Sequence, residues 1–185
     1  MGVMPASFAM LQGSYPRRDV KNPALYQYVD QAMKGIPGTP CCVQMSHALN
    51  MAGILIPRRS YRRENVGLKV SGRTYFYLLA TDEVEVFLFD LCGEGEMVNR
   101  DLQKTRSIGE IKKYLANRPG LLLFRYMNFR APPIQGQFEH TELWNGTNIL
   151  QRDMAEGFLF ARPRVLFWDA NDPAKWLVDY MKAPP

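Results

Sequence analysis

Two stretches in the first third of the chain have the hydrophobic pattern of helices. In Pro23–Lys34, between a possible Asn22 cap and a Gly35 stop, apolar side chains recur at helical spacing: Leu25, Tyr26, Val29 and Met33. The second stretch, from Pro40 to Ala52, is apolar on most of its sides and is followed by Gly53. Because a helix that is apolar nearly all round is usually buried, we expect the second helix to be central.

The pattern changes to that of strands after residue 119. Residues 120–126 form an apolar run typical of a buried strand, and residues 137–144, 147–152 and 164–168 are expected to be further strands. Asn145-Gly146 is a strong signal for a two-residue hairpin turn. Helices followed by antiparallel strands predict an α+β fold, with N-terminal helices packed on an antiparallel sheet.

Several other segments complete the expected elements. Residues 82–91 stay open between helix and strand: two acidic residues at the start favour a helix, whereas alternating valines and an apolar run favour a strand. Ser107 and Glu110 have capping-box spacing, which predicts a helix to about Asn117. A short extended stretch is expected at residues 74–77, and a terminal helix from Asp172 through Met181.

Composition and charge limit the class of protein. The chain has 185 residues, 46% of them hydrophobic, which suits one domain over residues 1–185. No apolar stretch is long enough to span a bilayer, and residues 1–13 lack the pattern of a secretory signal, so action outside the cytoplasm would require another export machine. The net charge is +5, with a basic run at residues 58–63 that favours a solvated loop. No zinc spacing, phosphate loop or nucleic-acid signature accompanies this run.

The cysteines offer a candidate nucleophile. Cys41, Cys42 and Cys92 form neither a disulfide framework nor a metal-binding spacing. With Thr39 as a cap and Pro40 first in the helix, Cys41 lies in the first turn, where the helix N-terminus favours a thiolate and free N–H groups can hold an oxyanion. Taken alone, this segment is better explained as small residues starting a core helix.

The sequence contains two histidines that can be weighed as the base. If Asn145 and Gly146 are the turn residues, His140 faces Gln151, and Asp153 lies one diagonal step away on the same face. Either Gln151 or Asp153 could orient the imidazole, although His140 alone would be an ordinary half-buried sheet histidine. Glu139 and Glu142 flank it with uncertain orientation. The other candidate, His47, lies roughly 120° around the helix and about 9 Å along it from Cys41, so we expect it to have a packing or surface role. We expect Cys92 to be structural.

Two segments together resemble a known family. Cys41-Cys42-x-x-Met45-Ser46-x-Ala48-Leu49-Asn50-x-Ala52-Gly53 resembles the nucleophile helix of the fourth family of type VI secretion amidase effectors. Gly120-Leu121-Leu122-Leu123-Phe124 and His140-x-Glu142-Leu143-Trp144-Asn145-Gly146 resemble that family's base strand and turn. The resemblance covers roughly residues 39–153. It implies a papain-like α+β fold.

The resemblance also implies site residues. The family nucleophile falls on Cys41, the base on His140 and the acid on position 151, which is Gln151 in this chain. Either Gln151 serves there or Asp153 takes the role. The glycine usual before the base is replaced by Glu139.

What the resemblance implies for function is a cysteine amidase that cuts the D-Glu–meso-diaminopimelate amide of cell-wall peptides. Such a toxin is made in the cytoplasm, injected into rival cells, active in their periplasm and neutralised in the producer by a cognate immunity protein. We expect no cofactor and no metal, peptidoglycan stems and the secretion machinery as partners, and no nucleic-acid partner or stable membrane insertion. A binding protein on an inactive amidase scaffold is the alternative, and Gln151 is the residue that keeps it open.

Overall fold

The computed structural model describes residues 2–16, 40–59, 61–62, 64–100, 105–132, 137–151 and 155–174. The expected helix at Pro23–Lys34, the Thr39 cap, Asp153 and most of the expected terminal helix lie outside these residues.

A four-stranded antiparallel sheet forms the centre of the molecule. Its strand order is β3 (Glu96–Met97), β6 (Arg164–Asp169), β4 (Gly120–Arg125) and β5 (His140–Trp144), so β4 is interior and β5 is an edge strand. The interior strand tolerates no side chain at its start, because a Cβ on Gly120 would lie 2.2 Å from the Trp168 carbonyl oxygen. All pairs between these four strands are antiparallel, which confirms this part of the expected fold class.

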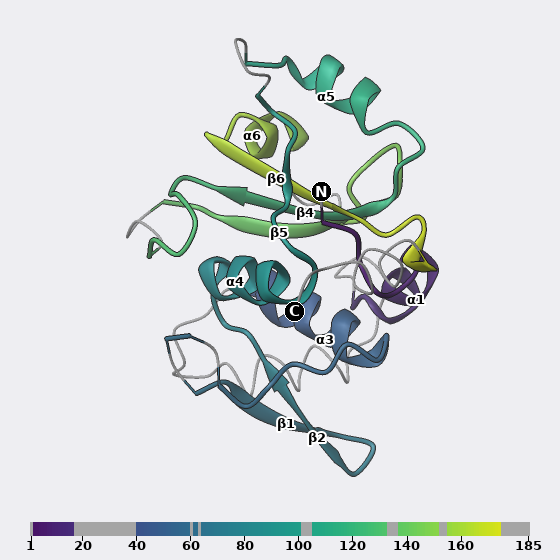
Figure 1. Cartoon of the computed structure of the whole chain (residues 1–185), viewed down its shortest axis with the longest axis vertical. Coiled ribbons are helices and arrows are strands. Elements are labelled where there is room, and N and C mark those ends of the chain that lie inside the picture. The colour runs from purple at the N-terminus through teal and green to yellow at the C-terminus, as the bar shows by residue number, and fades with distance from the viewer. Residues whose placement is uncertain are drawn as a thin grey trace, which may run out of the picture.

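Helices cover both faces of this sheet (Figure 1). α5 (Ile108–Tyr114) and α6 (Glu156–Phe160) lie on one side, and α3 (Pro40–Met51) and α4 (Thr81–Cys92) lie on the other. One apolar core lies between the sheet and the helices α3 and α4, and a second lies between the sheet and the helices α5 and α6. The mixture of helices and antiparallel sheets confirms the predicted α+β class.

The helix α3 is central, as its apolar pattern predicted. Every residue from Cys41 to Asn50 is buried. Its polar side chains are used to hold neighbouring segments: Ser46 Oγ donates to the Cys42 carbonyl and accepts from Leu78 N–H, and Asn50 Nδ2 donates to the Phe76 carbonyl. The helix is therefore fixed to the chain that links the β1–β2 hairpin (Val66–Val70 and Arg73–Tyr77) to α4.

Two segments that the sequence left uncertain are now defined. Residues 82–91 are helical, within α4, with Asp82 and Glu83 in the first turn, and the helix ends at Gly93 with φ +81°. Both halves of the Ser107–Glu110 capping box form at the start of α5, as predicted. The sequence did not predict α1 (Phe8–Ser14), β1, β3 or α6.

The hairpin after β5 corrects the predicted register. Trp144 pairs with Ile149 rather than Thr147, and Leu150 N–H donates to the Leu143 carbonyl at 2.9 Å. Asn145 Oδ1 accepts from the N–H groups of Thr147 and Asn148 at 2.9 and 2.8 Å, which widens the turn from two residues to four. The predicted strand at 147–152 is wrong, because only the isolated Trp144–Ile149 bridge forms there among the described residues.

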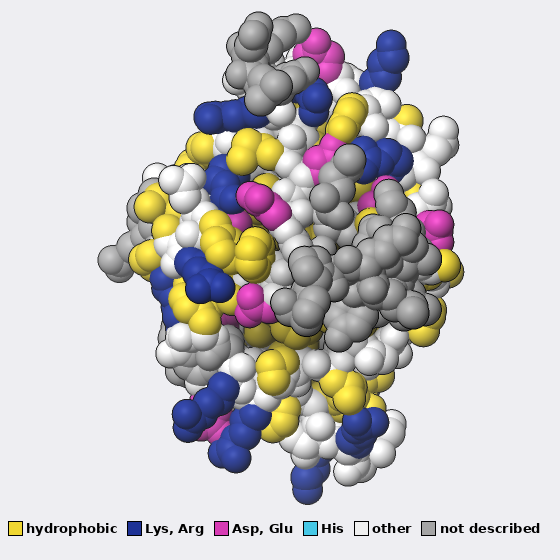
Figure 2. All heavy atoms as spheres, viewed as in Figure 1, with side chains coloured by type: hydrophobic (Ala, Val, Ile, Leu, Met, Phe, Trp, Pro, Cys, Tyr) yellow, Lys and Arg dark blue, Asp and Glu magenta, His cyan; other side chains and the backbone are white. Residues whose placement is uncertain are grey.

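In Figure 2, Lys and Arg side chains are spread over this face, including the lower end of the molecule, where Figure 1 places the β1–β2 hairpin. Exposed basic residues of this region are Arg58, Arg59, Lys69 and Arg73. Across the described ranges, no helix has the length and apolar character needed to cross a bilayer.

Candidate active site

The two adjacent thiols at the start of α3 differ in their surroundings. Neither Cys41 nor Cys42 is in a disulfide, and both lie in the first turn of the helix, next to Pro40. Cys42 is fully buried in the apolar core, whereas Cys41 keeps 6% exposure. The first turn leaves backbone N–H groups without helical partners, and this end of the helix stabilises negative charge. Cys41 therefore has the environment that favours a thiolate.

His140 begins the edge strand β5, and aromatic rings hold its imidazole. It pairs with Phe124 of β4, and the two rings stack with centroids 6.2 Å apart. Phe138 stacks on the imidazole with centroids 5.6 Å apart. Only 4% of His140 is exposed, so its ring has a fixed and largely dry position.

The structure brings Cys41 close enough to His140 for the two side chains to interact electrostatically. Burial alone lowers the pKa of His140, but the charge and hydrogen bonding of Cys41, followed by those of Glu142, outweigh burial and raise the pKa to about 10. Neither ring nitrogen has a hydrogen bond of ordinary geometry. At neutral pH the arrangement favours a thiolate beside an imidazolium.

Glu142 is the carboxylate nearest to the imidazole among the described residues. Because residues two apart in a strand point to the same side, Glu142 lies on the His140 side of β5, with Oε2 3.5 Å from Nε2. Burial raises the pKa of Glu142, opposed by His140, the Leu143 N–H and Tyr15. The sequence indicated Glu142 only as a neighbour of the base candidate His140. The spacing of two within a strand was the signal that could have identified it.

Gln151 lies elsewhere than the predicted register placed it. Its Oε1 accepts a hydrogen bond from Gln44 Nε2 at 2.7 Å, and the same nitrogen donates to the Pro16 carbonyl at 2.6 Å. Gln151 makes no hydrogen bond with the ring of His140, because neither ring nitrogen has a hydrogen-bond partner among the described residues. The observed register, extended by counting, places Glu142 rather than His140 opposite Gln151. Gln151 is therefore joined to the helix α3.

The remaining thiol and histidine have structural environments. His47 Nδ1 lies 2.9 Å from the Tyr77 hydroxyl, the two rings stack, and burial lowers the pKa of His47. Cys92 Sγ donates to the Leu88 carbonyl at 3.1 Å, and burial raises its pKa to about 12. Both environments agree with the structural roles expected from the sequence.

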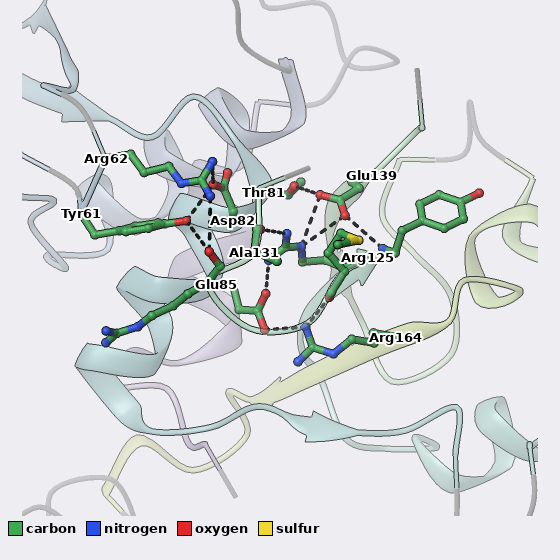
Figure 3. A network of polar contacts seen from close by, with 12 residues as sticks. Tyr61, Arg62, Thr81, Asp82, Glu85, Arg125, Ala131, Glu139 and Arg164 are labelled. Carbon is green, nitrogen blue, oxygen red and sulfur yellow. Dashed lines mark hydrogen bonds and ion pairs between the residues drawn. The ribbon is translucent and has the colours of Figure 1, made fainter. Parts of the chain in front are cut away.

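A buried ionic network holds the residue before the base (Figure 3). The Glu139 carboxylate accepts from Thr81 Oγ1, from Tyr126 N–H at 3.0 Å and from Arg125 Nε at 3.3 Å. The Arg125 side chain is fully buried and also pairs with Glu85 of α4. The acidic residue at the usual glycine position is thus matched by a buried arginine.

The same network continues to the neighbouring strand and loop. Arg164 Nη1 pairs with Glu85 at 2.9 Å and donates to the Met127 carbonyl at 2.7 Å, while Arg125 Nη2 donates to the Ala131 carbonyl at 2.7 Å. Figure 3 shows these side chains converging from α4, β4 and β6. The network joins the start of β5 to the helix α4 and to the loop after β4.

The described side chains offer a nucleophile, a base and a carboxylate, and no cluster of three or more metal-ligating groups occurs among them. This arrangement is suited to acyl transfer, in which a thiolate attacks a carbonyl and an imidazolium protonates the leaving group.

Comparison with known proteins identifies the fold. No family model matches the sequence, and no curated protein does. Among solved structures, the chain is similar to the type VI effector Tae4 of Enterobacter cloacae, with a TM-score of 0.58 and 18% identity over 91% of this chain and 99% of that chain. It is also similar to a chain of the Tae4–Tai4 effector–immunity complex of the same organism, with a TM-score of 0.59 and 17% identity over 90% and 99% of the two chains.

The Salmonella Typhimurium Tae4–Tai4 complex gives a further match, with a TM-score of 0.58 and 17% identity over 88% of this chain and 96% of that chain. The resemblance to the fourth amidase effector family is thereby confirmed at the level of the fold.

Proposed function

We propose that this chain is a peptidoglycan amidase with a cysteine nucleophile, acting as an interbacterial toxin. The observation that carries the proposal is the pairing of Cys41, at the start of a buried helix, with His140, whose pKa it raises. This pair lies on the fold of Tae4 effectors. The substrate is the amide between D-glutamate and meso-diaminopimelate in the wall peptide.

The mechanism proceeds through a covalent acyl-enzyme. The Cys41 thiolate attacks the amide carbonyl carbon, and N–H groups in the first turn of α3, including that of Cys41, stabilise the oxyanion. The His140 imidazolium donates its proton to the leaving diaminopimelate nitrogen as the C–N bond breaks. His140 then takes a proton from water, which attacks the thioester and releases the free glutamate carboxylate and Cys41.

The group that stabilises the charged His140 ring is assigned from the contacts of the ring. Glu142 supplies the negative charge that stabilises the imidazolium, since its carboxylate lies 3.5 Å from His140 Nε2. Gln151 is proposed to act as a positioning residue: through its hydrogen bond with Gln44 it fixes the start of the nucleophile helix.

The proposed setting follows from the same family of structures. Both complexes described above join an effector with the immunity protein Tai4. We propose that this chain likewise has a cognate immunity protein in the producing cell. A net charge of +5 suits an acidic immunity surface and an anionic wall. The secretion machinery delivers the chain, and it acts in the periplasm of the target cell.

Digestion of purified cell walls tests the proposal. Wild-type protein should release fragments with a new glutamate carboxyl and a new diaminopimelate amine, identified by mass spectrometry. His140→Asn should lower the rate by roughly 10²–10⁴-fold, the usual contribution of a general acid–base group. The matched control is His47→Asn, which changes the only other histidine and should keep the same products. Products cut at another bond, or equal loss in both variants, would reject the assignment.

The alternative is a binding protein on an inactive amidase scaffold. The Gln151–Gln44 contact favours it, because the position that resembles the family acid carries an amide directed to another amide. In that case the wild type should sediment with purified walls and release no fragments at any concentration.

A further inference from the structure

Two aromatic rings separate Arg162 from the proposed base, and this arginine has donors that no group of the described residues accepts. Arg162 is 6% exposed, and its Nη1 donates to the Tyr126 hydroxyl. Its Nε and Nη2 are buried and have no hydrogen-bond partner. No carboxylate of the described residues pairs with it. Buried charged groups are normally fully paired, so an unpaired guanidinium edge indicates a place for an acceptor.

The two unpaired donors form the part of the side chain that recognises carboxylates. Nε–H and the adjacent Nη2–H are parallel, and together they make the side-on fork that binds both oxygens of a carboxylate. The guanidinium carbon lies 3.8 Å from the Phe158 ring centroid and 4.6 Å from that of Tyr126. The backbone is also fixed, because Asn99 Nδ2 donates to the Arg162 carbonyl at 2.7 Å. The fork is thus preorganised.

Two exposed phenylalanines connect this fork to the base. Phe138 is 40% exposed and Phe158 is 48% exposed, and their ring centroids are 6.0 Å apart. Phe138 stacks on His140, and Phe158 lies against Arg162. We call this pair the Phe138–Phe158 ledge. Entry to the fork requires a side chain to move, and Phe158 is the exposed neighbour with room to do so.

We propose that the Phe138–Phe158 ledge and Arg162 form a substrate subsite for an aliphatic side chain that ends in a carboxylate. Methylene groups pack on the two rings, and the Arg162 fork binds the terminal carboxylate. The proposal rests on the proposed amidase function. Within a wall peptide, the diaminopimelate side chain has this chemistry, whereas lysine in the same position has the methylenes and the amine without the carboxylate.

A pair of synthetic peptide stems tests the subsite. The stems are identical except for diaminopimelate or lysine after D-glutamate, and kcat/KM is measured for each. The wild type should prefer the diaminopimelate stem by about ten- to hundredfold, the effect of a charge-assisted hydrogen-bond pair. Arg162→Met should lower the rate on that stem to the level of the lysine stem and leave the lysine stem nearly unchanged. Arg162→Lys keeps a buried cation without the fork, and it should lose most of the preference.

The matched control is Arg73→Met, which removes another arginine stacked on an aromatic ring, Tyr75, in the β1–β2 hairpin. This variant should keep the full preference. A preference that persists in Arg162→Met and Arg162→Lys would overturn the proposal. Equal loss on both stems, with circular dichroism showing folded protein, would also overturn it, because that result describes a purely structural arginine.

A binding measurement separates the subsite from the reaction. In the Cys41→Ala variant, the Nε–H resonance of Arg162 is followed by NMR while each stem is added. A shift with the diaminopimelate stem and none with the lysine stem supports the subsite. No shift with either stem overturns it. If the wild type cleaves neither stem, the proposed function fails, and this titration alone decides the subsite.

Discussion

The protonation state of His140 depends on two neighbouring groups that act in the same direction. Burial opposes the charged ring, while Cys41 and Glu142 favour it strongly enough to bring the pKa to about 10. A histidine on an edge strand with ordinary solvent around it would titrate near 6.5. This shift favours the imidazolium at neutral pH, which is the form that the proposed mechanism needs to protonate the leaving amine.

The pH dependence of kcat/KM follows from this shift. Since the active pair contains the imidazolium, activity should fall on the alkaline side as His140 loses its proton, near pH 10 rather than 6.5. Glu142 is one of the groups that raise this pKa, so Glu142→Gln should move the alkaline limb to lower pH. Glu64→Gln changes an exposed partner of Arg58 and should leave the limb in place. If the alkaline limb of the pH profile is unchanged in Glu142→Gln, Glu142 does not have its proposed role in the site.

The position of Gln151 gives a second prediction for single residues. If Gln151 acts through the nucleophile helix, Gln151→Ala and Gln44→Ala break the same hydrogen bond and should lower kcat by similar factors. The double variant should then be hardly worse than either single variant. A large loss in Gln151→Ala with little effect of Gln44→Ala would instead support direct orientation of His140, as the resemblance implied. Asp153→Asn, measured beside them, tests the other residue considered for that role.

The sequence predicted the proposed pair but not its surroundings. Cys41 and His140 were found because helix-start chemistry and a short motif are local properties of the chain. The partner of Gln151 was missed, because Asn145 caps its own turn with its side chain and changes the register by two residues. Glu142 was noted without its orientation. A side chain's partners depend on long-range packing, which a sequence pattern does not specify.

Among the elements, the start of β5 depends on the helix α4 for its position. The Arg125 side chain is fully buried and pairs with Glu85 of α4 and with Glu139 next to the base. Arg164 of β6 neutralises the remaining charge. The sequence left residues 82–91 open between helix and strand because alternation and acidic start signals conflicted. The buried Glu85 resolves this, since it reaches Arg125 from the helix.

Removal of Arg125 should therefore destabilise the protein. Arg125→Met leaves Glu85 and Glu139 buried beside a neutral side chain, and breaking such a pair costs about 3–5 kcal/mol of the free energy of unfolding. The control is Asp90→Asn, which breaks an exposed pair with Arg130 and should cost about 0–1 kcal/mol. Urea unfolding followed by circular dichroism measures both. Equal stabilities for the two variants would show that the network does not hold the elements together.

For the molecule as a whole, the buried Cys41–His140 pair is proposed to act on a target outside the inner membrane. The α+β class and the central position of α3 followed from the hydrophobic pattern. The extended stretch predicted at residues 74–77 is confirmed as part of β2, whereas β1 was missed because it is short and partly exposed. Sheet elements that lie at the surface leave a weaker apolar signal than buried runs such as β4.

If the cell wall is the target, the protein should be toxic only when it reaches the periplasm. A version of the chain directed to the periplasm by an added signal should lyse the host, while the same chain in the cytoplasm should be tolerated. His140→Asn with the same signal should be harmless at equal expression. Growth curves and microscopy measure the outcome. Equal toxicity in the two compartments would indicate a cytoplasmic target instead of peptidoglycan.

The central claim is that Cys41, and not its neighbour, is the nucleophile. Cys41→Ala and Cys42→Ala differ by one position at the start of α3 and remove thiols of the same size. Hydrolysis of purified walls by the two folded variants, measured as released diaminopimelate amines, is the most direct test. We predict no release by Cys41→Ala and release close to the wild-type rate by Cys42→Ala. Loss of activity only in Cys42→Ala, or equal loss in both, would contradict the account.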